Sequence, residues 1–216
     1  KEFGSETFRR RFQNLLQLVA DGHLSDGLVV VASFLSLVLP MVTTARVLTA
    51  LQRDAMYLQG YWGPPAESAA LRRDGLAFER IVAERHPDLV GVLESADVSL
   101  AFLATQWLAS LFFHVLPSKG RFALFDAFLE DGVLFLMRFG LALLESRMPL
   151  LIKAQNEAAV REVLERAEDD TGDGGVSLVK RARVYAPGMA LDDEELEHCR
   201  LWGDEAGADA AQVVRS

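Results

Sequence analysis

Apolar residues recur along most of this chain with the period of an α-helix. The N-terminal stretch shows the pattern clearly, because one helical face carries Phe8, Phe12, Leu15, Leu16 and Val19. Arginine, glutamine and asparagine occupy the opposite face, which indicates an amphipathic helix that stops at Asp21-Gly22.

Four further helices are expected before residue 100. Either Ser25 or Asp26 caps the first of them, since a short side-chain oxygen accepts from the free N–H groups of a first helical turn. If Asp26 has only a structural role, we expect it to be this cap. The predicted ranges, bounded by capping residues or prolines, are 27–39, 43–57, 71–86 and 88–95.

The most informative stretch runs from Phe102 to Glu145. An aromatic-rich helix stops at Pro117, and a short helix carrying Phe125-Asp126 follows it. An acidic, glycine-containing break at 130–132 then precedes a segment that is apolar on every side, which predicts a buried helix. Each apolar run is shorter than the ~20 residues that span a bilayer, so no transmembrane segment is expected. Together these patterns predict an all-α fold.

Composition narrows the class of protein. The net charge of −9 argues against a nucleic-acid partner, because affinity for phosphate backbones comes from clustered Lys and Arg. The single cysteine, Cys199, excludes an internal disulfide and fits a reducing compartment. With no signal-peptide pattern at the N-terminus, we expect a cytoplasmic protein, open to recruitment to a membrane or the cytoskeleton through a partner.

The chain divides into four segments by composition. Residues 1–5 have the composition of vector-derived sequence, which indicates a fragment of a longer protein, and 6–167 form the helical domain. An acidic, glycine-rich linker occupies 168–175. Residues 176–216 are expected to be a tail with one short helix near 193–202, which begins with a capping box after Leu191.

Five elements in order resemble one known family. They are the apolar helix 27–39, Leu71-Arg72-Arg73-Asp74, the segment 86–93, Thr105-Gln106-Trp107 and Leu124-Phe125-Asp126. Over roughly residues 8–165 the chain resembles the TBC domain, the all-helical fold of GTPase-activating proteins for Rab GTPases. Phe125 departs from the Trp that usually precedes the aspartate, and Gln106 stands where a basic residue or serine is frequent.

The resemblance implies two catalytic side chains, and neither is in its place. Family members supply an arginine from I-x-x-D-x-x-R and a glutamine from Y-x-Q-G, which stabilise and position the phosphoryl transfer in trans. Alignment of the first apolar helix puts Asp26 at the glutamine position, and a carboxylate has the wrong sign to face a γ-phosphate. The arginine motif is absent from all 216 residues. It was either lost or lies upstream in the full-length protein.

Three other features are weaker candidates. A literal Tyr57-Leu58-Gln59-Gly60 is expected to be a coincidence, since it closes a helix instead of opening one. His198-Cys199 is the one metal-like pair, which is too few ligands for zinc, so no metal site and no cofactor are expected. In the tail, Leu191, Leu196 and Trp202 can dock a helix into a groove of this domain or of a partner.

The sequence therefore predicts a non-catalytic TBC-like domain that binds proteins, with a Rab-type GTPase or another protein as partner. The alternative is an active GTPase-activating protein whose arginine lies upstream. A third interpretation is an architectural part of a larger assembly, anchored through 176–202.

Overall fold

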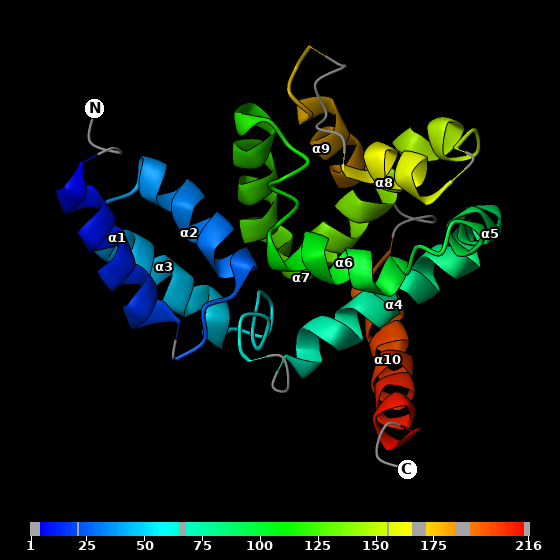
Figure 1. Ribbon diagram of the computed structural model, residues 1–216, viewed down its shortest axis with the longest axis horizontal. Coiled ribbons are helices and arrows are strands. Elements are labelled where there is room, and N and C mark those ends of the chain that lie inside the picture. Colours follow the sequence, from blue (N-terminus) through cyan, green and yellow to red (C-terminus); the bar gives the residue numbers. More distant parts are fainter. Residues whose placement is uncertain are drawn as a thin grey trace.

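The computed structural model describes residues 5–20, 22–64, 68–154, 156–165, 172–184 and 191–213, with side chains as far as Gly207. Within these ranges the chain forms ten helices and no strand, so the predicted all-α fold is confirmed. Residues 1–4 lie outside the described ranges, as do 168–171 of the predicted linker. Figure 1 shows the blue N-terminal helices grouped at one end of the molecule.

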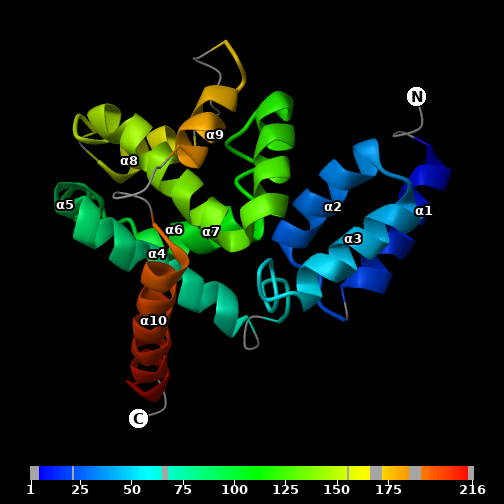
Figure 2. The same ribbon diagram turned by 180° about the vertical axis from the view of Figure 1, so that it is seen from behind.

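The three N-terminal helices are α1 (Glu6–Val19), α2 (Asp26–Val38) and α3 (Met41–Arg53), which lie side by side (Figures 1 and 2). The cap of α2 is Ser25, whose Oγ accepts from the Leu28 N–H at 3.3 Å, so Asp26 is the first helical residue and not the cap. Helix α3 begins directly after Pro40 and ends four residues earlier than predicted, because Asp54 is already in an extended conformation.

The middle of the chain folds into α4 (Ala69–Arg85), α5 (Pro87–Ser95) and α6 (Leu100–Ala109). Helices α4 and α6 cross in close contact at Gly75, where an added Cβ would lie 2.7 Å from Thr105 Cγ2 and 2.8 Å from the Ala101 carbonyl oxygen. A glycine therefore sets the spacing of these two helices.

Helix α7 (Ser118–Leu151) is broken where the sequence predicted a break. Gly132 has φ 62° and ψ −144° inside it, and the Val133 N–H donates to the Met56 carbonyl at 3.0 Å. After this kink the residues from Val133 to Leu144 are almost all buried, as their uniform apolarity predicted. No helix within the described ranges combines the length and apolarity that a bilayer crossing requires.

The C-terminal part differs from the prediction of one short helix in a tail. After α8 (Glu157–Glu165), residues 176–183 form α9 (Val176–Arg183), which packs on α7 through Leu178, Val179 and Ala182. The helix that was predicted to end near residue 202 is α10 (Asp193–Val213), and it packs on α4. Neither contact is visible from local spacing, since both partners lie far away in the sequence.

The kink at Gly132 gives a direct test of the fold. In Gly132→Ala the new Cβ would overlap the Met56 carbonyl oxygen at a positive φ, so we expect a loss of at least ~2 kcal/mol in the free energy of unfolding. Urea denaturation measures it. The control is Gly91→Ala in exposed α5, which meets nothing within 4 Å and should stabilise by ~0.5–1 kcal/mol. Equal stability of the two variants would contradict the described kink.

Candidate functional site

The start of α2 is held rigidly against the end of α6. Gly27 lies so close to Ala109 that an added Cβ would be 2.5 Å from the Ala109 carbonyl oxygen. The same oxygen accepts a hydrogen bond from Trp62 Nε1 at 2.8 Å, and Trp62 is almost fully buried. The loop after α3 and the end of α6 therefore fix the position of the first turn of α2.

Asp26 projects from this fixed turn into solvent. It is exposed, and within the part of the chain that the structure describes its carboxylate makes no hydrogen bond or ion pair. As an acidic residue in a first helical turn it interacts favourably with the positive end of the α2 dipole. It thus lowers the positive potential that a helix N-terminus would otherwise present to an anion.

The tetrapeptide Tyr57-Leu58-Gln59-Gly60 lies in the turns that follow α3 and does not open a helix. Leu58 is fully buried, the Tyr57 hydroxyl donates to the Leu129 carbonyl at 2.9 Å, and Gly60 has φ 74°. Gln59 is exposed at the rim of a hollow of about 230 Å³ between this turn, α4 and α10. Its surroundings differ from those of Asp26, which stands at a helix start.

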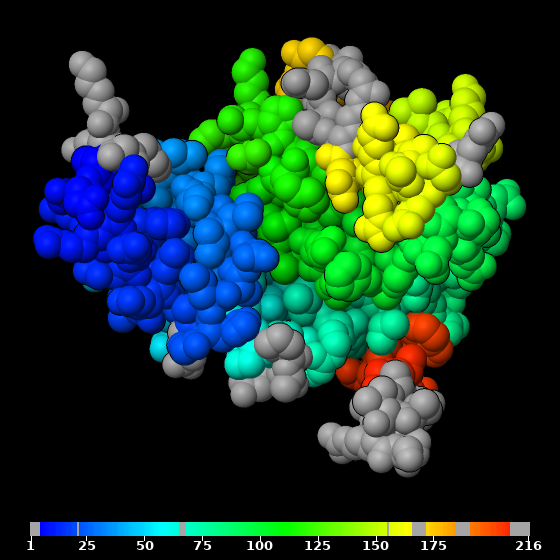
Figure 3. All heavy atoms as spheres, in the orientation of Figure 1, coloured from blue at the N-terminus to red at the C-terminus, as the bar shows by residue number. Residues whose placement is uncertain are grey.

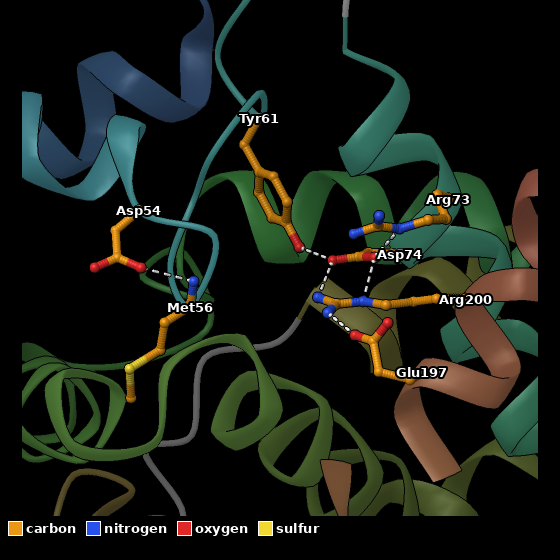
Figure 4. Close-up of polar contacts among 7 residues, drawn as sticks. All are labelled: Asp54, Met56, Tyr61, Arg73, Asp74, Glu197 and Arg200. Carbon is orange, nitrogen blue, oxygen red and sulfur yellow. Dashed lines mark hydrogen bonds and ion pairs between the residues drawn. The ribbon is translucent and has the colours of Figure 1, made fainter. Parts of the chain in front are cut away.

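A buried ion cluster lies beside that hollow (Figure 4). Asp74 on α4 has no exposed surface, and its carboxylate accepts from Arg200 Nε at 2.8 Å and from Arg200 Nη2 at 2.7 Å. The Tyr61 hydroxyl donates to the same carboxylate at 2.5 Å, and Arg73 Nε donates at 2.9 Å. Such bidentate, charge-assisted bonds tie α10 to α4 and to the loop after α3.

The cluster changes the ionisation of its members. Burial raises the pKa of the Tyr61 phenol well above its ordinary value, and the charge of Asp74 raises it further. Burial by itself would lower the pKa of Arg200, but its hydrogen bonds to Asp74 outweigh that effect and raise it. Arg200 is therefore a permanent cation that neutralises the Asp74 carboxylate.

Other contacts extend the seam between α10 and α4. Arg85 makes a two-pronged pair with Glu195 at 2.7 Å, and Leu196 and Cys199 are buried. Trp202, the predicted docking residue of the tail, is half-buried with the Arg80 guanidinium 5.1 Å from its ring centroid. Sequence reasoning missed the Asp74–Arg200 pair, for which the available signal was an aspartate within the apolar face of α4.

The described residues hold no group of three or more His, Cys, Asp or Glu side chains in metal-binding proximity. His198 and Cys199 are neighbours in the chain, but Cys199 points into the core of the α10 seam. His114 is exposed and shares a hydrogen bond with Ser110 Oγ at 2.9 Å.

Comparison with known proteins identifies the class. The Rab-GTPase-TBC domain family matches residues 23–152, more than half of the chain, and the chain belongs to this family. The matched region begins just before Asp26 and ends at Ile152, the first residue after α7.

Three relatives illustrate the similarity. Carabin of Mus musculus is 32% identical over 89 residues, 41% of this chain and 20% of that protein. Growth hormone-regulated TBC protein 6 of Caenorhabditis elegans is 28% identical over 146 residues, 67% of this chain and 44% of that protein. Small G protein signaling modulator 3 of Bos taurus is 22% identical over 155 residues, 67% of this chain and 21% of that protein. The matched part thus spans less than half the length of these relatives.

The ion cluster predicts that replacing Arg200, which is distant from Asp74 in the sequence, lowers the stability of the fold substantially. Arg200→Leu leaves the buried Asp74 carboxylate with Arg73 and Tyr61 alone, so the free energy of unfolding should fall by about 2–4 kcal/mol. In the control, Arg161→Leu removes an exposed i,i+4 pair with Glu157 and should cost less than ~0.5 kcal/mol. Urea denaturation compares the two, and similar losses would contradict a stabilising cluster.

The raised pKa of Tyr61 predicts a dependence on alkaline pH. Because this pKa is higher in the folded than in the unfolded chain, its contribution to stability is present below about pH 10 and is lost as pH rises through the folded value. Part of the tyrosinate absorbance should therefore appear only together with unfolding, and Tyr61→Phe should lack that part. Circular dichroism measures unfolding in the same titration. If every tyrosine ionised at a lower pH than the chain unfolds, the result would contradict the burial of the Tyr61 phenol.

Proposed function

We propose that this domain is a non-catalytic member of the TBC family that binds a Rab-type GTPase or another protein without accelerating GTP hydrolysis. The observation that carries the proposal is Asp26. It occupies the family's glutamine position at the start of α2, and its exposed carboxylate is available to whatever protein meets that turn.

The chemistry of phosphoryl transfer explains why this residue matters. Such transfer is accelerated by positive charge and by a group that positions water, and an arginine supplied in trans contributes ~10³–10⁵ in rate. Asp26 adds a negative charge where negative charge develops on the phosphoryl oxygens. Because Gly27 packs closely on Ala109, the backbone of the first turn of α2 is fixed, and this turn cannot move the charge of Asp26 away.

The surface beside Asp26 suits protein binding. Leu24 directly precedes the cap of α2 and is 54% exposed, so an apolar side chain stands next to the carboxylate on a rigid turn. The proposal is that a partner protein contacts this apolar and acidic surface.

The catalytic part is tested by single-turnover GTP hydrolysis with a panel of Rab proteins, using this chain and a version extended upstream. We expect less than ~10-fold stimulation from either protein, and the same from Asp26→Gln, because the arginine motif is absent from these 216 residues and we propose that the upstream chain does not supply it. Asp88→Gln changes an exposed acidic residue in the first turn of α5 and is the matched control. Stimulation of ~100-fold or more by the extended wild-type chain would favour the alternative of an active enzyme with an upstream arginine.

The binding part is tested separately with Rab proteins loaded with a non-hydrolysable GTP analogue. Leu24→Asp should weaken binding at least ~10-fold by placing an unpaired charge in the interface. Leu37→Asp, near the other end of α2 and 56% exposed, should leave it unchanged. Absence of binding to every Rab protein would assign the surface to a different class of protein.

A further inference from the structure

Helices α1 and α3 belong to the N-terminal group at the end of the molecule away from α10 (Figures 1 and 3), and an open groove runs between them. Its volume is about 1590 Å³, and both helices contribute a continuous stripe of residues to it. The α1 stripe is Phe8, Arg11, Asn14, Leu15 and Leu18. The α3 stripe is Val42, Ala45, Arg46, Thr49, Ala50 and Arg53.

The lining of the groove is mixed, with apolar, polar and arginine side chains along both helices. Leu18 is 76% exposed and Val42 is 67% exposed, although other apolar residues of the same two helices are buried. At the C-terminal end of α1, Gln52 Nε2 donates to the Val19 carbonyl at 3.3 Å and joins the two helices. The α1 stripe covers 11 helical positions and the α3 stripe covers 12, which corresponds to a length of about 16 Å, or three turns.

The groove is positively charged, whereas the chain as a whole is negatively charged. Arg11, Arg46 and Arg53 line it, all are exposed, and the lining contains no acidic residue. Within the described part of the chain, none of the three guanidinium groups pairs with a carboxylate, whereas the whole chain carries a net charge of −9. The only acidic residue of α1 is Glu6, outside the lining, and α3 has none.

We propose that this groove binds an acidic amphipathic helix of a partner protein. A helix of about three turns matches the length of both stripes, and its apolar face covers Leu15, Leu18 and Val42. Acidic residues along its two edges then meet Arg11 on one side and Arg46 and Arg53 on the other. The alternative of an anionic membrane is disfavoured by shape, because the lining residues surround a groove between two helices, whereas a bilayer presents a flat surface.

The binding test uses two designed helical peptides of roughly 18 residues, or about five turns, long enough to fill the groove with about a turn to spare at each end. Both have leucines on one face. One has glutamates along both edges, and the other has lysines at the same positions. Fluorescence anisotropy should show the acidic peptide binding the wild-type chain at least ~10-fold more tightly than the basic peptide, with a preference that falls at high salt.

A charge exchange locates the contact. The double variant Arg11→Glu/Arg46→Glu should bind the acidic peptide at least ~10-fold more weakly than the wild-type chain does, and should bind the basic peptide more tightly. Arg10→Glu, on the same helix but outside the lining, is the control and should keep the wild-type preference. Circular dichroism verifies that both variants are folded, as their exposed positions predict.

The proposal would be overturned if the two peptides bound equally well, or if the charge exchange left the peptide preference unchanged. It would also be overturned if both peptides bound with a dissociation constant above about 1 mM, which corresponds to a binding free energy weaker than −4.1 kcal/mol. Arg11-dependent binding to vesicles of phosphatidylserine and phosphatidylcholine without any peptide preference would overturn it as well and would assign the surface to lipid. Since no GTPase takes part, these results are independent of the function proposed above.

Discussion

The uniform apolarity of α7 after Gly132 is the constraint on which the rest of this fold depends. A helix that is apolar on every side is stable in water only when other elements enclose it completely. Helices α5, α6, α8 and α9 all contact α7, and Phe135, Phe139 and Leu143 have no exposed surface. The kink at Gly132 is part of the same solution, since it turns the buried half away from the first half and lets Val133 bond to Met56.

The start of α2 shows how the packing of a scaffold positions an exposed side chain. Close packing of Gly27 on Ala109, supported by Trp62, fixes the first turn of the helix. The side chain that this turn presents is the carboxylate of Asp26. Membership of the Rab-GTPase-TBC family therefore establishes the scaffold, whereas activity depends on the residues placed on it.

The two ends of the molecule differ in how they treat charge. At the α10 seam, arginines and carboxylates are paired and largely buried, so their charges cancel and contribute to packing. In the groove between α1 and α3, three arginines remain exposed and without carboxylate partners in the described chain. Paired charges at an internal seam stabilise a fold, whereas unpaired charges of one sign beside exposed apolar side chains are typical of a surface that binds another molecule.

Local chemistry determined much of this protein from its sequence alone. The helical period, the stops at Pro40 and Pro87 and the break at Gly132 each depend on neighbouring residues, so all are readable from a linear chain. The choice between Ser25 and Asp26 as the cap of α2 was decided by the structure. Tertiary structure alone decided that α9 and α10 pack back on the domain. Asp74 and Arg200 are 126 residues apart, and no spacing rule relates side chains whose meeting depends on how whole helices pack.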